Sequence, residues 1–248
     1  MLAAVHGRPA LQTTVVRPDS QHTSYTAGIA WMDPSLVRFA LHPGTQEPGG
    51  GPWAEPSSIA TAERRVMLAA FNGGFRLDAA RGGFYEQGRY RGVLRAGAAS
   101  LVVSSDGRAS VQMWGRDVRM GPTIQAVRQN LDLLVDRGAV VPGLDRNTKH
   151  RWGATIGNRL YVWRSGVGTT ASGALIYLAG DRLSAATLAE LLRRAGCVRA
   201  MELDINPEWT SYVLYPSEHN LLPDMRRSPT RYDTTSSRDF IGVERRAA

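Results

Sequence analysis

The sequence RAMELDINPEWTSY, residues 199–212, begins as a buried strand and ends in a loop stiffened by proline. Apolar residues alternate there with Glu202 and Asp204, and the alternation stops at Asn206-Pro207. Because successive side chains of a strand point to opposite faces, we expect Glu202 and Asp204 to share one face. Burying an ionised carboxylate without a partner costs several kcal/mol. The pattern therefore predicts arginines, a metal ion or a substrate beside these two carboxylates.

The composition is that of a globular protein with a basic surface. The chain has 248 residues, 43% of them hydrophobic, which suffices for one large domain with a real core. The formal net charge is +8, and all but one of the 30 basic residues are arginine. These arginines are scattered, without the basic blocks and interleaved aromatics of nucleic-acid-binding proteins. We therefore expect no nucleic-acid partner.

The cysteine and histidine content and the apolar runs argue against a disulfide, a thiolate or histidine metal site and a membrane helix. Cys197 is the single cysteine, and the five histidines show no spacing typical of metal ligands. No apolar run approaches the ~20 residues of a membrane helix, and the first residues lack the features of a signal peptide. Either an export segment precedes this chain and the protein is extracellular or in the cell envelope, or the protein is cytoplasmic. The sequence leaves both open, and the oligomeric state as well.

Hydrophobic periodicity predicts many strands and two helices. Alternation, apolar runs and turn signals predict strands at 27–33, 36–44, 64–71, 100–114 (a hairpin), 152–166 (a hairpin), 173–180 and 238–245. The strands at 27–33 and 36–44 are expected to pair through a turn at Asp33-Pro34. Apolar residues at 124, 127, 131 and 134 predict a helix over 123–138. A second helix is predicted over 183–196, with Ser184 as its N-cap and Gly196 at its end.

These elements predict an α+β fold, because strands and helices do not alternate strictly. We expect a single domain with a mixed or antiparallel β-sheet core and a few packed helices. Residues 1–24 are expected to form an N-terminal strand and a loose arm. Residues 25–248 are expected to form the catalytic domain.

Two short motifs follow predicted strands. In Asn72-Gly-Gly-Phe75, the glycines permit either a tight turn or a close approach to other groups, and the Asn72 amide can face a pocket. In WRSGVGTT, residues 163–170, Arg164 and Ser165 enter a Gly-x-Gly segment. A guanidinium, a hydroxyl and backbone N–H groups together suit a phosphate. A third polar segment, RQN at 128–130, is expected on the solvated face of the first helix.

The order of these motifs resembles the phosphodiester glycosidase family over about residues 66–215. The resemblance rests on Asn-Gly-Gly-Phe after a buried strand, Arg-Ser-Gly-Val-Gly, Gly-Asp-Arg before a Leu-rich helix, and Leu-Asp at a strand end. Where the family has Leu-Asp-Gly-Gly-Gly-Ser, this chain has Leu-Asp-Ile-Asn-Pro-Glu-Trp, which is similar to a bacterial, actinobacterial subgroup. The loop at 205–209 is stiffer than the family's glycine loop, so the family's sugar specificity and mechanism do not transfer directly to this chain.

The resemblance implies cleavage of a sugar-1-phosphodiester between the anomeric carbon and a phosphate oxygen. It implies that Asp204 faces the sugar, with Glu202 or Glu208 as the second carboxylate. The implied substrate- and phosphate-binding residues are Asn72, Arg164, Ser165, Arg182, Asn206 and Trp209. The sequence marks no definite cofactor. A divalent cation near the carboxylates is compatible with the sequence, but nothing in the residue spacing demands one.

Two other functions remain open at this stage. One is a metal-dependent phosphodiesterase that breaks the P–O bond. The other is a catalytically silent module that binds cell-wall glycans or glycan phosphates, because the Gly-Gly-Gly-Ser loop is absent.

Overall fold

The largest element of the structure is an eight-stranded antiparallel sheet. The structure is a computed structural model that describes residues 2–146 and 151–247. The strand order in this sheet is β1-β2-β3-β14-β13-β15-β11-β12. In chain order the strands are β1 (Leu2–Val5), β2 (Arg8–Val16), β3 (Ala27–Met32), β11 (Leu133–Asp136), β12 (Ala139–Val140), β13 (Val162–Thr170), β14 (Leu175–Leu183) and β15 (Cys197–Glu202).

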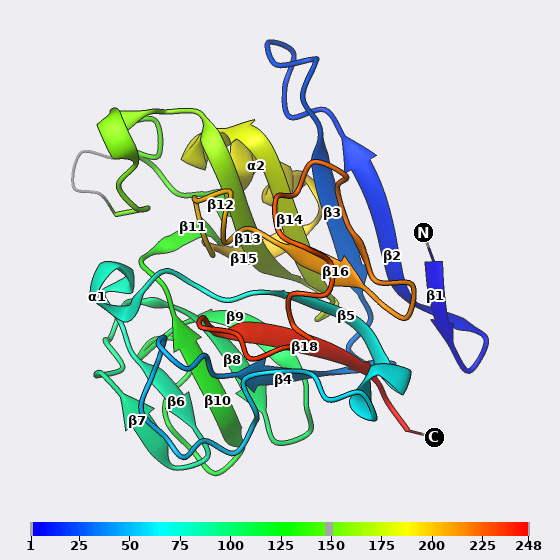
Figure 1. The fold of residues 1–248 in the computed structure, drawn as a ribbon. Coiled ribbons are helices and arrows are strands. Elements are labelled where there is room, and N and C mark those ends of the chain that lie inside the picture. Colours follow the sequence, from blue (N-terminus) through cyan, green and yellow to red (C-terminus); the bar gives the residue numbers. More distant parts are fainter. Residues whose placement is uncertain (1, 147–150, 248) are drawn as a thin grey trace.

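Two five-stranded antiparallel sheets lie beside it, below it in the view of Figure 1. One has the order β7-β6-β10-β8-β9, with β6 (Phe84–Glu86), β7 (Arg89–Arg91), β8 (Ala99–Ser104), β9 (Ala109–Met113) and β10 (Ile124–Gln129). The other has the order β17-β16-β5-β18-β4, with β4 (Val37–His42), β5 (Met67–Asn72), β16 (Tyr212–Leu214), β17 (His219–Asn220) and β18 (Phe240–Arg245).

One helix of substantial length packs on the large sheet. Helix α2 (Ala185–Arg194) begins after Ser184, whose side chain accepts a hydrogen bond from the Thr187 N–H, and Gly196 follows its end with φ +93°. Its leucines pack against the sheet in a shared core with Ile176 and Ala200. The other helical segments described are α1 (Leu77–Ala80) and the 3-10 turns η1 (Glu63–Arg65) and η2 (Ile156–Asn158). The helix predicted over 183–196 is confirmed as α2, with Ser184 as its N-cap.

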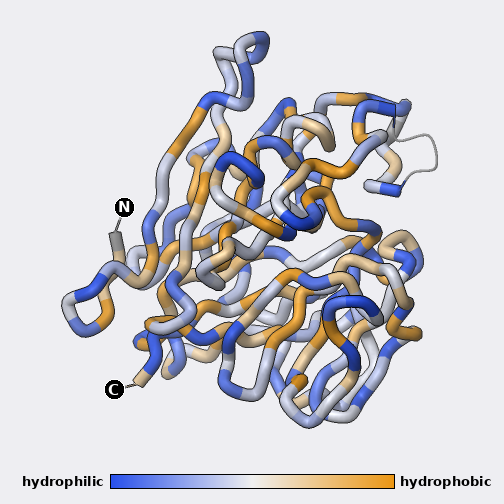
Figure 2. The backbone as a smooth tube through the Cα atoms, turned by 180° about the vertical axis from the view of Figure 1, so that it is seen from behind, coloured by the Kyte–Doolittle hydropathy of each residue, from blue (hydrophilic) through white to orange (hydrophobic). Residues whose placement is uncertain are grey.

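The chain is richer in β-structure than an α+β class implies. It is a single sheet-rich domain, and hydrophobic stretches concentrate in its inner strands while hydrophilic stretches occupy many outer turns (Figure 2). The strands predicted at 64–71, 100–114, 173–180 and 238–245 are present as β5, β8–β9, β14 and β18. Strand β18 lies inside its sheet, between β5 and the edge strand β4. Its ladders therefore tie the end of the chain into the fold.

The helix predicted over 123–138 is wrong. This segment forms β10 and β11, which belong to two different sheets. Residues 126–129 of β10 are all buried, so the strand shows no polar and apolar alternation. The apolar residues at 124, 127, 131 and 134 therefore recur at a spacing that also fits one face of a helix. Leu131, with φ +58°, breaks the strand direction between β10 and β11.

Two predicted pairings are also wrong. Strands β3 and β4 exist where expected, but β3 pairs with β2 and β14, whereas β4 pairs with β18 in another sheet. The expected hairpin at 152–166 has only its second arm, β13, because η2 lies where the first arm should turn. Nearest-neighbour pairing along the chain is only a tendency, and here packing between sheets overrides it.

Candidate active site

Polar residues from all three sheets meet at a set of strand ends. Asn72 ends β5, Asn130 follows β10, Asp204 lies two residues after β15, and Asp239 directly precedes β18. All four are nearly or fully buried. Buried polar groups require partners, and here they supply them to one another.

A buried ion pair joins Arg128 to Asp239. Arg128 Nε donates to Asp239 Oδ2 at 2.7 Å and Nη2 donates to Oδ1 at 3.2 Å. Arg128 Nη1 also donates to the Gln129 carbonyl, and Nη2 donates to the Phe75 carbonyl. The side chains of Arg128 and Asp239 are 1% and 0% exposed. The pair therefore connects β10 of one sheet to the start of β18 in another, entirely out of water.

Asn130 carries the same network to the large sheet. Its Oδ1 accepts from the Phe75 N–H, and its Nδ2 donates to the carbonyls of Glu202 and Leu203 at 2.7 and 3.1 Å. The expectation that residues 128–130 lie on a solvated helix face is wrong, because all three are fully buried. They fix the backbone at the end of β15, from which Asp204 extends.

The glycines of the Asn-Gly-Gly-Phe motif serve a close approach of backbone to this network. Neither Gly73 nor Gly74 has a positive φ. A Cβ on Gly73 would lie 2.0 Å from Asp239 Oδ2, and one on Gly74 would lie 3.1 Å from both the Arg128 and Asn130 side chains. Of the two alternatives for these glycines, the structure favours the close approach.

Asn72 and Ser165 hold the backbone of Asp204. Asn72 Nδ2 donates to Ser165 Oγ at 3.1 Å, and Ser165 Oγ accepts from the Asp204 N–H at 3.2 Å. Asn72 Oδ1 accepts from the Tyr177 hydroxyl and from the Ser211 N–H. In this structure the two predicted phosphate ligands contact protein groups, and Ser165 is fully buried.

The Asp204 carboxylate is buried beside one arginine. Its Oδ2 lies 3.3 Å from Arg238 Nη2, and its Oδ1 accepts from the Asn206 N–H at 2.9 Å. Asp204 is 3% exposed, and burial raises the pKa of its carboxyl to about 6, against the attraction of Arg238. A carboxylate so placed changes charge close to neutral pH, as groups at functional sites often do.

Glu202 is paired to Arg164 beneath the site. Arg164 Nη1 donates to Glu202 Oε1 at 2.5 Å, and its Nε donates to the Leu183 carbonyl. Burial raises the pKa of Glu202 to about 7 despite the neighbouring guanidinium. Oε2 of Glu202 has no hydrogen-bond partner within the described ranges. The arginine predicted for phosphate is thus engaged by the first of the two carboxylates.

The loop at 205–209 carries three more predicted residues, of which Asn206 is exposed and Glu208 and Trp209 are half-buried. Three guanidinium carbons, those of Arg238, Arg227 and Arg231, lie 4.8, 4.9 and 5.8 Å from the Trp209 ring centroid. Glu208 pairs with Arg226 at 3.2 Å and with Arg227 at 3.6 Å. Positive charge therefore surrounds an aromatic ring close to Asp204.

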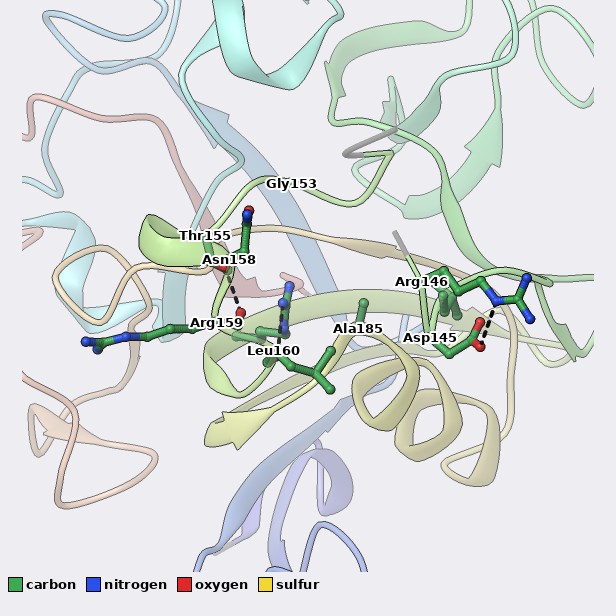
Figure 3. Close-up of a pocket in the computed structure, with 10 residues that line it drawn as sticks. Asp145, Arg146, Gly153, Thr155, Asn158, Arg159, Leu160 and Ala185 are labelled. Carbon is green, nitrogen blue, oxygen red and sulfur yellow. Dashed lines mark hydrogen bonds and ion pairs between the residues drawn. The ribbon is translucent and has the colours of Figure 1, made fainter. Parts of the chain in front are cut away.

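Residues of this loop line two cavities. One of about 470 Å³ is lined by Asn206, Glu208, Arg182 and the aromatic residues Tyr161 and Trp163, among others. One of about 420 Å³ is lined by Trp209, Arg227, Arg231 and the segment 233–237. A smaller cavity of about 260 Å³, lined by Arg146, Asn158, Arg159 and Arg164, adjoins the Arg164–Glu202 pair (Figure 3).

Sequence reasoning finds one group of residues here and misses another. The structure brings Asn72, Ser165 and Asp204 together, and it places Arg182, Asn206 and Glu208 on one cavity. The missed residues are Arg128, Asn130, Arg227, Arg231, Arg238 and Asp239. Arg238-Asp239, a charged pair at the start of the strand predicted over 238–245, is the signal that marks two of them.

The sequence model of the phosphodiester glycosidase family matches residues 66–243, and the chain belongs to that family. No curated protein matches the sequence.

Two solved structures share the fold. The zebrafish N-acetylglucosamine-1-phosphodiester alpha-N-acetylglucosaminidase catalytic domain, auto-inhibited by its pro-peptide, aligns with a TM-score of 0.61 and 15% identity. The alignment covers 100% of this chain and 87% of that one. A hypothetical protein from Synechocystis aligns with a TM-score of 0.56 and 14% identity, over 99% of this chain and 64% of that one.

Two features are absent from the described residues: a membrane-spanning helix and a cluster of metal-binding side chains. None of the helices there is long and apolar enough to cross a membrane. No group of three or more His, Cys, Asp or Glu residues suited to a metal ion occurs in the same ranges.

The packing of Gly73 against the ion pair yields a stability prediction. Gly73→Ala should lower the free energy of unfolding by ~1–3 kcal/mol or more, because the new methyl group overlaps Asp239 Oδ2 and must displace the Arg128–Asp239 pair. Urea denaturation monitored by circular dichroism measures this change.

Gly121→Ala is the matched control. Gly121 has no positive φ, and its nearest atom to an added Cβ is 4.0 Å away. This variant should unfold within ~0.5 kcal/mol of the unsubstituted protein. Equal stability of the two alanine variants would contradict the tight packing at Gly73.

Proposed function

We propose that this protein hydrolyses sugar-1-phosphodiesters at the bond between C1 and the phosphate oxygen, releasing the sugar and a phosphomonoester. The observation that carries the proposal is the buried Asp204 carboxylate, which is paired with Arg238 and directly precedes a loop whose residues line two cavities. Membership of the phosphodiester glycosidase family supports the same reaction class.

The proposed chemistry assigns the two charges of this pair to the two halves of the scissile bond. As the C1–O bond breaks, positive charge develops at C1 and negative charge on the departing phosphate. Asp204, ionised above pH 6, would stabilise the developing cation or activate a water. Arg238 would turn its guanidinium toward the phosphate, since one guanidinium can bridge two oxygens. A phosphate leaves with little protonation, so charge stabilisation is the main requirement.

The other predicted residues form two groups: those that line a cavity and those that are buried. Asn206, Glu208 and Arg182 line a cavity beside Asp204, so we assign them to the sugar side, with Glu208 as the second carboxylate. Trp209 would offer an aromatic face to the substrate. Asn72, Ser165 and the Arg164–Glu202 pair are buried, and we assign them to positioning Asp204 and its strand.

Asp204→Asn should fall in kcat/KM by at least ~10²-fold, the usual scale for a positioned acid–base or electrostatic group. The folded-state pKa of Asp204 is raised, so its contribution to stability is fully present below the ordinary Asp pKa and is lost as pH rises through about 6. The melting temperature of the variant should therefore equal or exceed that of the unsubstituted protein at pH 8, with no gain at pH 4.

Asp224→Asn, on an exposed carboxylate, is the control and should leave both activity and melting temperature unchanged. An Asp204→Asn protein that is destabilised at pH 8 but retains normal activity per folded molecule would assign Asp204 a structural role.

Hydrolysis in oxygen-18 water separates the two enzymatic alternatives. Cleavage at C1–O should place the label in the released sugar, because water attacks carbon. Label in the phosphomonoester would instead indicate attack at phosphorus, as in a phosphodiesterase. Binding of sugar-1-phosphodiesters without any turnover would favour the glycan-phosphate binding module.

A further inference from the structure

The cavity of about 420 Å³ beside Trp209 has a lining unlike that of the sugar-side cavity. Its lining residues are Trp209, Arg227, Arg231, Asp233 and the hydroxyl residues Ser228, Thr230, Thr234, Thr235, Ser236 and Ser237. Arginine and hydroxyl donors on a concave surface are the groups that bind phosphate oxygens.

The positive charge of this cavity is incompletely neutralised. Arg231 donates to the Trp209 carbonyl at 3.3 Å and to Ser211 Oγ at 2.8 Å, and it forms no ion pair with the described part of the chain. Asp233, the acidic residue of the lining, pairs with Arg64 at 3.3 Å. The cavity therefore has a net attraction for an anion.

Several hydroxyl donors of the cavity are unused. The side chains of Thr234, Thr235 and Ser237 make no hydrogen bond to the residues described in the structure, whereas Ser228 and Thr230 bond to each other at 2.7 Å. Thr234 and Thr235 are exposed. A bound phosphate could accept from these hydroxyls without breaking an existing bond.

The cavity is connected to the reacting pair through Trp209 and Arg238. Arg238 contacts Asp204 through Nη2, and its guanidinium carbon lies 4.8 Å from the Trp209 ring centroid. Its Nε is buried and has no hydrogen-bond partner among the residues that the structure describes. Arg227 lies 4.9 Å from the same ring. Arg227 donates from Nε to the Glu208 carbonyl at 2.7 Å and pairs with the Glu208 carboxylate at 3.6 Å. Arg231 forms no ion pair within the described ranges, so its charge is the one left for a group other than the reacting phosphate.

We propose that this cavity is a second anion subsite, which binds a phosphate dianion carried by the leaving half of the substrate. The link to turnover rests on the proposed function: Arg238 and Asp204 act on the scissile phosphodiester, while Arg231, Arg227 and the free hydroxyls hold a second phosphoryl group beyond Trp209. The favoured substrates are sugar-1-phosphodiesters whose aglycone is itself phosphorylated.

Binding of inorganic phosphate, measured by calorimetry at constant ionic strength, tests the subsite itself. Arg231→Gln should weaken binding by at least ~10-fold, because hydrogen bonds to charged groups are worth a factor of that order. Thr235→Glu should weaken it similarly by placing a negative charge at an exposed position that makes no hydrogen bond. This second variant keeps the test valid if Arg231→Gln does not fold.

Arg193→Gln is the matched control, since Arg193 lies on α2 and pairs with Glu190. It should bind phosphate as the unsubstituted protein does. Phosphate binding that is absent, or that both cavity variants leave unchanged, would overturn the proposal.

Turnover of two matched substrates tests the role of the subsite. For a sugar-1-phosphodiester with a terminally phosphorylated alkyl aglycone, Thr235→Glu should raise KM at least ~10-fold with kcat unchanged. For the analogue with a neutral alkyl aglycone, KM should not change. Equal effects on both substrates would contradict the subsite.

Asp204→Asn distinguishes the failure of this proposal from failure of the proposed function. It should lower kcat/KM for both substrates by at least ~10²-fold while phosphate binding to the cavity persists. Normal turnover by this variant, with phosphate binding intact, would contradict the proposed function but not the subsite. Loss of phosphate binding in the folded variant would contradict the proposal that the cavity beside Trp209 binds phosphate separately from Asp204.

Discussion

The buried ion pair of Arg128 and Asp239 is the interaction on which the arrangement of the three sheets depends. Both side chains are out of water, so removing either would leave an uncompensated buried charge at a cost of ~3–5 kcal/mol. The pair joins two sheets, and Asn130, two residues further along, hydrogen-bonds the third at the end of β15. Gly73 and Gly74 are required because the β5 end passes directly against these side chains.

This network determines what Asp204 can do. The backbone around Asp204 is held by Asn130 on one side and by Asn72 and Ser165 on the other. Its carboxylate contacts the Arg238 guanidinium and accepts from the backbone N–H groups of Ile205 and Asn206. A carboxylate fixed in this way is held in place before any substrate binds. Its burial raises the pKa to about 6, and ionisation of Asp204 therefore opposes stability while serving the proposed reaction.

The sequence predicts the local elements better than their assembly. Helix α2, with its Ser184 cap, and strands β5, β14 and β18 follow from periodicity and turn residues. The β10–β11 segment does not, because a strand buried on both faces loses the two-residue alternation that identifies strands. The site residues divide in the same way, into those marked by local sequence motifs and those brought in by contacts between sheets. The motif positions of Asn72, Ser165 and Asp204 are readable, whereas Arg128, Asn130 and Arg238 join the site only through contacts between sheets.

A crystal structure of the protein with a non-hydrolysable sugar-1-phosphodiester, in which a methylene group replaces the anomeric oxygen, tests the central claim most directly. The account predicts C1 of the sugar within ~3–3.5 Å of an Asp204 carboxylate oxygen or of a water bound to it. It also predicts the phosphonate on Arg238, with the Arg128–Asp239 pair unbroken. A ligand bound away from the 204–209 loop, with Asp204 still enclosed by protein, would contradict it.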